Sequence, residues 1–452
     1  MLPILLGEKV INKIPQFALE AIEVLEAHGH SANLVGGCLR DILLGREPGD
    51  YDINTSAMPE ETQKAFAGYH QVDTGIKHGT VSVWIQGQQV EITTYRNDGT
   101  YSDGRHPDQV SLGAELAEDL KRRDFTINAM CWSPKKGLVD LFGGEQDLKV
   151  PVIRCVGNPW ERFSEDALRI LRALRFASVL DGQIHQDTDK AIRELAPTLD
   201  KVSRERCAVE LVKLLKGPGA FRIIMEYPQV LDVVVPGIGR MEGYDQQNPY
   251  HCYTLLEHTA TVVKNVPPTT VDRLAAFLHD IAKPLCRTVD EKGIAHYKGH
   301  QAKGAEVAQG ILENLRLDRS TIQQVVTLIK HHDDNVDGIT EAGIRRMLGR
   351  LGEDAFDHLM HLKKADNLGQ NRERSNRIPN LERVCLVKEE ILANEKPYKL
   401  NQLAVNGADL MELGFKPGPQ MGKTLEKLLD LVIEGDLSNT KEELIKYLNK
   451  HR

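Results

Sequence analysis

The sequence predicts an α+β fold, in which a small head with a mixed or antiparallel sheet precedes an elongated, all-helical body. Three observations support this prediction. Apolar and polar residues alternate over residues 70–95 between glycine-containing turns, which is typical of antiparallel strands. Beyond residue 142, nearly every segment has the spacing of an amphipathic helix. The 452 residues, 41% of them apolar, are enough for two to four domains with a substantial core.

The elements of the head follow from its apolar runs and turn residues. An amphipathic helix over residues 12–29 precedes a short strand at 34–35, which leads into a turn at Gly36-Gly37. We predict a short helix at residues 40–44, a strand at 50–54 and a second helix at 58–67. Three antiparallel strands follow at 70–73, 79–85 and 88–95, then a mobile polar loop at 97–109 and a last strand at 138–142.

Two segments with little periodicity divide the helical remainder. Residues 236–249 are rich in Gly, Gln and Asn, and a second break lies near residues 372–379. We therefore predict four domains. They are a head at residues 1–150, a helical neck at 151–240, a histidine-containing domain at 250–370 and a helical tail at 380–452.

Composition narrows the class of protein. The net charge of −8 argues against a wholesale nucleic-acid coat, although a local basic groove remains compatible with it. The seven cysteines are scattered, odd in number and without a Cys-x-x-Cys pair, so we expect no disulfide framework or zinc knuckle. Residues 2–6 are too short an apolar run for a signal peptide or membrane span, and no other segment is long enough. We expect a cytoplasmic protein without a membrane partner.

Two glycines end the first strand, and Asp50 and Asp52 follow on the next. Positions i and i+2 of a strand share a face, so both carboxylates should point to one place. Close like charges resist joint ionisation unless a cation lies between them, and Mg²⁺ is commonly held by one or two carboxylates together with substrate phosphates. Gly37 would let a phosphate approach the backbone, and Arg40 would add charge. The glycine turn and the Asp-x-Asp pair together predict nucleotide transfer. Alone, the glycines are compatible with a simple tight turn and the aspartates with a solvated strand.

Further charged residues extend this site. Glu91 lies between apolar residues on a strand, where a third catalytic carboxylate would complete a metal site or orient the incoming hydroxyl, or would simply face solvent. Arg122 and Arg123 adjoin an apolar stretch, so at least one should point into the cleft and bind triphosphate oxygens. Ordinary charge on a helix surface is the alternative.

A helix beginning near Ser164 is predicted to carry Asp166, Arg169, Arg172 and Arg175 at intervals of three, which keeps consecutive members on neighbouring faces. A salt-bridged surface helix is the alternative. Carboxylate only accepts hydrogen bonds and guanidinium only donates them. Cytosine and adenine both present an amino donor beside a ring-nitrogen acceptor, whereas guanine and uracil reverse this order. Asp166 beside Arg169 would therefore select C and A without a template, each match contributing about 1–3 kcal/mol.

These residues resemble class II tRNA nucleotidyltransferases, the CCA-adding enzymes of the DNA polymerase β superfamily. The matching motifs are Gly36-Gly37, Arg40-Asp41, Asp50-Tyr51-Asp52, residues 122–129, residues 140–144 and Glu165-Asp166 with Arg169. The resemblance implies that Asp50 and Asp52 hold Mg²⁺ and that Gly37, Arg40 and Arg123 serve the nucleotide. It further implies that Asp166 and Arg169 select C and then A, with Arg172 and Arg175 contributing.

The resemblance also predicts the reaction: addition of CCA to the 3′ end of tRNA from CTP and ATP, with no obligate protein partner. Residues 94–107 match the family's flexible loop, which looks shortened in enzymes that add only C, but Arg105-His106-Pro107 replaces the Arg-Arg-Pro of many relatives. Bacterial poly(A) polymerases share the head motifs, whereas residues 402–447 resemble the CCA-adding tail, which binds tRNA. An A-adding enzyme and a poly(A) polymerase remain alternatives.

Histidines gather between residues 251 and 366, and an adjacent His279-Asp280 pair is flanked by apolar residues. This pattern resembles the HD phosphohydrolase domain. The resemblance implies that a divalent transition metal is bound by His258, His279, Asp280 and Asp366, with His300 and His331 as second-metal or phosphate contacts. A phosphodiesterase or phosphatase activity on RNA ends would follow. A structural helical domain without metal is one alternative, and an HD phosphohydrolase whose head only binds RNA is another.

Overall fold

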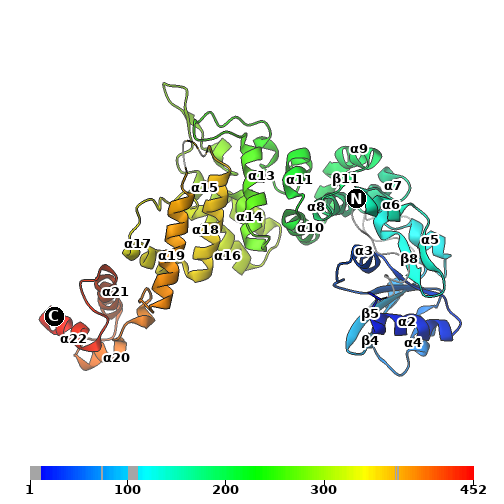
Figure 1. Ribbon diagram of the computed structural model, residues 1–452, viewed down its shortest axis with the longest axis horizontal. Coiled ribbons are helices and arrows are strands. Elements are labelled where there is room, and N and C mark those ends of the chain that lie inside the picture. Colours follow the sequence, from blue (N-terminus) through cyan, green and yellow to red (C-terminus); the bar gives the residue numbers. More distant parts are fainter. Residues whose placement is uncertain (1–11, 73–74, 100–109, 372, 374–375, 452) are drawn as a thin grey trace. The chain divides into compact units, whose positions relative to one another are not determined.

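The computed structural model describes residues 12–72, 75–99, 110–371, 373 and 376–451. The chain divides into two compact units, Met1–Gly239 and Arg240–Arg452, and their boundary lies within the segment predicted as a linker. The predicted α+β class is confirmed, since a mixed-sheet head is followed by helices (Figure 1). The finer division into four domains stays a prediction.

Among the described residues of the head, one sheet has seven strands in the order β3-β4-β5-β2-β1-β8-β9. All neighbouring strands are antiparallel except β2 and β5, which run parallel. The three antiparallel strands predicted within residues 70–95 are confirmed. The strands are β1 (Ala32–Val35), β2 (Asp52–Thr55), β3 (His70–Val72), β4 (Thr80–Ile85), β5 (Gln88–Thr94), β8 (Met130–Ser133) and β9 (Gly137–Asp140).

One face of this sheet is covered and the other carries the carboxylates. Helices α2 (Gln16–Ala27) and α4 (Pro59–Ala65) pack on β4 and β5 (Figure 1). Val81, Val83 and Ile92 are buried at alternate positions, so they define the covered face. Glu91 is exposed and lies in register with Asp52, so both belong to the opposite face.

Several sequence-based boundaries were wrong, three of them beside the carboxylates and arginines. The strand predicted from residue 50 begins at Asp52, and Asp50 lies in a bend after Gly49. Helix α3 (Gly37–Leu43) begins at the second glycine rather than at Arg40. The helix predicted from Ser164 is broken, since α7 (Pro159–Glu165) ends before Asp166 and α8 (Leu168–Val179) follows. Asp166 is extended at φ −145°, which frees its Oδ1 to accept a hydrogen bond from Leu168 N at 3.0 Å.

The remainder is mainly helical, although the paired segments β10 (Val152–Ile153) with β11 (Gln183–Ile184), and β12 (Thr288–Val289) with β13 (Ala295–His296), were not predicted. The other helices of the first unit are α5 (Leu116–Lys121), α6 (Gly144–Lys149), α9 (Gln186–Leu195), α10 (Arg204–Lys216), α11 (Ala220–Glu226) and α12 (Pro228–Asp232).

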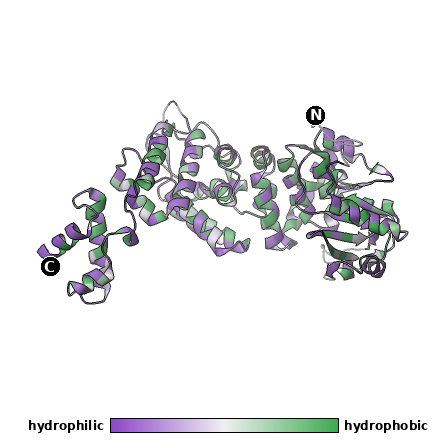
Figure 2. Cartoon of the chain, turned by 60° about the horizontal axis from the view of Figure 1, so that its bottom comes forward, coloured by the Kyte–Doolittle hydropathy of each residue, from purple (hydrophilic) through white to green (hydrophobic). Residues whose placement is uncertain are grey.

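The second unit is built from amphipathic helices, which alternate hydrophobic and hydrophilic residues along their length (Figure 2). Several begin with a side-chain cap, among them Thr254, Thr269 and Asp318. Among the described helices, none is long and apolar enough to cross a membrane. The helices are α13 (Leu255–Asn265), α14 (Thr270–Leu278), α15 (His300–Asn314), α16 (Arg319–His331), α17 (Glu341–Leu351), α18 (Glu353–Leu368), α19 (Ile378–Ala393), α20 (Gly407–Glu412), α21 (Pro419–Glu434) and α22 (Lys441–Lys450).

Candidate active site and metal centre

A cleft of about 960 Å³ in the first unit lies between α3, the start of β2, α8 and α10. Among the described residues, ten basic and six acidic side chains line it, which suits a polyanion held together with a cation. The predicted site residues that line the cleft are Gly37, Arg40, Asp50, Asp52, Arg123, Asp166, Arg169, Arg172 and Arg175. The structure thus brings together residues that lie more than a hundred positions apart in the sequence.

Asp52 is the electrostatic centre of the carboxylate group. Burial, together with the charges of Asp50 and Glu91, raises the pKa of Asp52 to about 6, although Arg123 acts in the opposite direction. A carboxylate in this position favours a cation over a proton at neutral pH. The donors are all oxygens, and Asp50 is exposed enough to turn toward an ion, so the set suits Mg²⁺.

Gly36 is the glycine that the cleft requires. It has a φ of +79°, and a Cβ there would lie 3.0 Å from Arg123 Nη1 and 3.7 Å from Asp52 Oδ2. At Gly37, which the sequence singled out for nucleotide binding, a Cβ would make only ordinary contact with Arg40 at 3.8 Å. The turn therefore packs Arg123 and Asp52 closely against a backbone that has no side chain.

The arginines at the mouth of the cleft are anchored by buried acceptors. Arg40 donates to Asn128 Oδ1 at 2.7 Å, and its guanidinium lies 4.9 Å from the Phe176 ring centroid. Arg122 and Arg123 pair with Asp119 at 2.7 and 3.4 Å. Burial would raise the pKa of Asp119, but these two guanidinium groups outweigh it and hold the pKa below its ordinary value.

Asp166 and Arg169 both face the cleft, but each is paired elsewhere. Asp166 Oδ2 accepts from Arg206 Nη2 at 2.6 Å. Arg169 forms an ion pair with Glu165 at 2.5 Å and donates to the Arg122 carbonyl at 3.3 Å. These contacts, two of them from the cleft-lining residues Arg206 and Arg122, hold the carboxylate and the guanidinium in place, and a base would use their remaining hydrogen-bonding capacity.

Arg172 and Arg175 are tied to acidic residues on other elements. Arg172 Nε donates to the buried Asp124 at 2.8 Å, and Arg175 pairs with Glu210 on α10. The Arg175 guanidinium also lies 3.7 Å from the Phe176 ring centroid. Burial would raise the pKa of Asp124, but the charge of Arg172 dominates and holds it well below its ordinary value. These pairs join α8 to the head and to α10.

The predicted flexible loop is only partly within the described residues. Residues 100–109, with Arg105-His106-Pro107, lie outside them. The flanking strands β6 (Arg96–Asp98) and β7 (Val110–Leu112) pair in antiparallel fashion.

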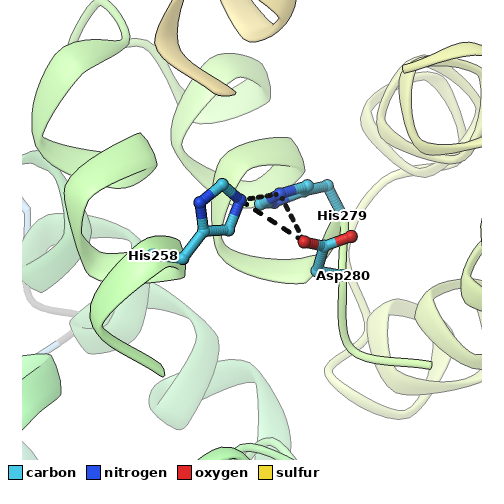
Figure 3. A group of neighbouring side chains, drawn as sticks. All are labelled: His258, His279 and Asp280. Atoms are coloured by element: carbon cyan, nitrogen blue, oxygen red, sulfur yellow. Dashed lines mark hydrogen bonds and ion pairs between the residues drawn. The ribbon is translucent and has the colours of Figure 1, made fainter. Parts of the chain in front are cut away.

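The second unit contains a buried cluster of histidines around Asp280. His258 Nε2 and His279 Nε2 lie 3.2 Å apart, and each lies within 3.4 Å of Asp280 Oδ2 (Figure 3). Asp366 Oδ1 lies 3.1 Å from His258 Nε2. The sequence therefore identified four side chains that converge in the folded chain, from α13, the end of α14 and α18.

A second group meets the other oxygen of the same carboxylate. His300 Nε2 and His332 Nε2 lie 3.4 and 3.7 Å from Asp280 Oδ1. The sequence had named His331, but its Nδ1 pairs with Asp334 at 2.7 Å and the next residue takes its place. His332 keeps helical backbone angles, with φ −62° and ψ −30°, so it points to a different side from His331, and its Nε2 lies 3.2 Å from His300 Nε2 on α15.

The tautomer of all four histidines is set by the backbone. Each Nδ1 lies 2.7–2.9 Å from a main-chain carbonyl oxygen. The pairs are His258 with Gly369, His279 with Ala276, His300 with Tyr297, and His332 with Ile329. Each Nδ1 therefore donates, so the neutral form of each imidazole has no proton on Nε2, which is directed inward as in histidines that bind metals. Both oxygens of Asp280 are buried without a hydrogen-bond partner among the described residues, although Lys283 forms an ion pair with Oδ2 at 2.6 Å. The donor set suits a divalent transition metal.

The chain matches three protein-family models and is similar to named proteins over almost its whole length. Residues 32–154 match the family model of the poly A polymerase head domain. Residues 183–238 match that of a probable RNA and SrmB-binding site of polymerase A, and residues 300–448 a putative tRNA nucleotidyltransferase domain 2. The CCA-adding enzyme of Lactobacillus helveticus is 34% identical over 97% of this chain and 98% of its own length. The chain belongs to the CCA-adding enzyme family.

Other members of the CCA-adding enzyme family agree over the same length. The Levilactobacillus brevis enzyme is 35% identical over 95% of this chain and 96% of its own. The crystal structure of the Bacillus stearothermophilus CCA-adding enzyme in complex with CTP is similar with a TM-score of 0.70 and 28% identity, covering 96% of this chain and 97% of that one. The family resemblance seen in the sequence is confirmed.

Within this CCA-adding enzyme fold, the sequence missed the residues that hold the arginines in place. Asp119, Asp124, Arg206 and Glu210 each pair with an arginine or aspartate of the cleft. Asp124 lies inside a recognised motif, but nothing in its neighbours indicates that it pairs with Arg172. Glu210 lies among apolar residues of α10, and a buried acid in an amphipathic helix was the one signal that pointed to a partner.

Proposed function

We propose that this chain adds CCA to the 3′ end of tRNA from CTP and ATP, without a nucleic-acid template, and releases pyrophosphate. One observation carries the proposal: the cleft joins a carboxylate group suited to Mg²⁺ with Asp166 and Arg169, two side chains able to read a base. Full-length similarity to CCA-adding enzymes supports this reading over poly(A) polymerase, because the similarity extends through the tail.

In the proposed reaction, the 3′-hydroxyl of tRNA attacks the α-phosphate in line. The new bond joins the 3′-oxygen to the α-phosphorus, the bond to the bridging oxygen breaks, and the hydroxyl releases its proton as pyrophosphate leaves. Asp50 and Asp52 would hold Mg²⁺, which when bound supplies charge stabilisation for the attacking and leaving oxygens. Arg40 and Arg123 bind phosphate oxygens, and Glu91 orients the incoming hydroxyl.

Three incubations test this proposal, using a tRNA that ends at its discriminator base. CTP alone should add two residues, ATP alone should add none, and both together should add CCA, as read on a sequencing gel. Addition of A without prior C would contradict the proposal and favour an A-adding enzyme or a poly(A) polymerase.

Exchanging the two base-reading residues should change nucleotide choice. With Asp166→Arg and Arg169→Asp, donors and acceptors are reversed, so incorporation of UMP or GMP relative to CMP should rise by roughly 10–100-fold, given about 1–3 kcal/mol per match. The measurement is competition between labelled triphosphates, with Asp187→Arg as an exposed control. Unchanged selectivity would refute the assignment.

For the second unit we propose a metal-dependent phosphohydrolase activity of the HD type, acting on 2′,3′-cyclic or terminal phosphates of RNA. The inward Nε2 atoms and the buried Asp280 carboxylate, whose two oxygens lie 3.2–3.7 Å from four of them, favour it over a purely structural role. His258, His279, Asp280 and Asp366 would bind one metal, and Asp280, with His300 and His332, would bind a second. Bound there, the metal would supply an activated water as nucleophile.

The two activities should separate by mutation. His279→Ala should reduce hydrolysis of a 2′,3′-cyclic phosphate by at least about 10²-fold, because a metal ligand is lost, while CCA addition stays within about twofold. Phosphate release and nucleotide addition are measured on the same preparation, with His28→Ala as an exposed control. Equal hydrolysis by the variant and the parent would refute the HD activity.

We further propose that the enzyme works in the cytoplasm. All seven cysteines are free, four of them buried, which suits a reducing compartment.

A further inference from the structure

A second group of possible metal ligands lies away from the Asp280 cluster. Asp272, in the first turn of α14, meets His358 and His361 of α18. Its Oδ1 lies 3.0 Å from His358 Nδ1 and 3.3 Å from His361 Nδ1. The three ligand atoms all lie within 4.8 Å of one another.

The carboxylate of this group is held in place from behind. The Asp272 side chain is 0% exposed, and its Oδ2 accepts a hydrogen bond from the Thr269 hydroxyl at 2.6 Å. Thr269 is also the cap of α14, since its hydroxyl accepts from Asp272 N at 3.1 Å. Only Oδ1 is left to face α18, and a buried carboxylate requires a positive partner there.

The distances suit an ion shared by three ligands. A tetrahedral zinc ion at about 2.0–2.1 Å from each ligand separates the ligands by about 3.3 Å. Residues three apart on a helix share a face, so His358 and His361 approach from one side. Hydrogen bonding alone would place two imidazoles on one oxygen, and His358 Nδ1 is buried without a hydrogen bond of acceptable geometry among the described residues.

We propose that Asp272, His358 and His361 form a site for a divalent transition metal such as zinc, with water as the fourth ligand, which clamps α14 to α18. Imidazole and carboxylate donors in this number suit zinc. The site is separate from the proposed HD centre and does not depend on the function of that centre.

The position of the clamp gives it a structural consequence. The two helices run in the same direction, because Asp272 meets His358 nearer their starts, while His279 Nε2 lies 3.7 Å from Asp366 Oδ1 near their ends. Seven residues separate Asp272 from His279, which is about 10 Å along a helix. An ion at the clamp would therefore fix the relative position of the two helices that carry Asp280 and Asp366.

Metal counting on the full-length chain tests the clamp. The metal-stripped protein is titrated with Co²⁺ alone, and bound equivalents and the visible band of four-coordinate Co²⁺ are measured. His361→Gln and Asp272→Asn should each bind one equivalent fewer than the parent, or bind it at least tenfold more weakly, whereas the exposed control His28→Gln should match the parent. His361 is 42% exposed, so its replacement should leave the fold intact, as circular dichroism will show.

Thermal unfolding with and without Zn²⁺ separates the clamp from a hydrogen-bonded triad. Zn²⁺ should raise the unfolding midpoint of the parent more than that of His361→Gln, because an ion bound only by the folded state stabilises it. Equal cobalt stoichiometry and affinity in all variants would overturn the proposal. So would a substitution that changes the midpoint by the same amount with and without metal.

Discussion

Replacing Asp52 with asparagine should reduce CCA addition by at least about 10³-fold, equivalent to about 4 kcal/mol of transition-state stabilisation. Asparagine keeps the size of the side chain and removes the charge that the site presents to a cation. Initial rates with CTP and a tRNA lacking CCA give the measurement. Asp187→Asn, an exposed acid on α9, is the matched control. Transfer by the Asp52 variant within threefold of the parent would rule out the assignment.

The same residue predicts a pH dependence of the metal requirement. Because the pKa of Asp52 is raised to about 6, a proton competes with the cation below that pH. The Mg²⁺ concentration for half-maximal transfer should therefore rise by roughly tenfold per pH unit below about 6, and stay nearly constant above about 7. A requirement that is flat from pH 5 to 8 would contradict the role of this carboxylate.

Removal of the Asp124 carboxylate should have the largest effect on stability. Asp124 is 8% exposed and bonds to Arg172 and to Asn128, so Asp124→Ala leaves the Arg172 side chain, which is 33% exposed, without its main partner. Breaking a fully buried pair costs about 3–5 kcal/mol, and we expect about 2–3 kcal/mol here, because water and Glu210 still reach the Arg172 guanidinium. Urea denaturation of the full-length chain measures the change, and Asp187→Ala should alter stability by no more than about 0.5 kcal/mol. A loss of less than about 1 kcal/mol for the Asp124 variant would contradict the prediction.

The stabilising effect of the Asp124 carboxylate should weaken in acid. The pKa of Asp124 lies below its ordinary value in the folded chain, because Arg172 outweighs the effect of burial. Its contribution to stability is therefore fully present above the unfolded pKa and is lost as the pH falls through the folded pKa. The stability difference between parent and Asp124→Ala should be constant from pH 7 to about 5 and narrow below about pH 4. An unchanged difference down to pH 3 would contradict this assignment.

Much of the site could be predicted because its chemistry is local in the sequence. The glycine turn, the Asp-x-Asp pair and the arginines of α8 each have a spacing that indicates their use. The helix break at Asp166 was not predictable, because it depends on one extended residue whose carboxylate replaces the missing backbone hydrogen bond. The same limit applies at His331 and His332, where one residue of helical phase decides which imidazole faces Asp280.

The sequence alone determined the α+β class, the carboxylate pair, the residues proposed to read a base and all but one of the histidines proposed to bind metal, since residue type and periodicity carry that information. Only the tertiary structure decided which partners hold those residues: Asp119 for Arg123, Arg206 for Asp166, Asp124 for Arg172, and one shared carboxylate, Asp280, for four imidazoles. The physical reason is that these pairings depend on long-range packing, which brings side chains together without leaving a local pattern in the chain.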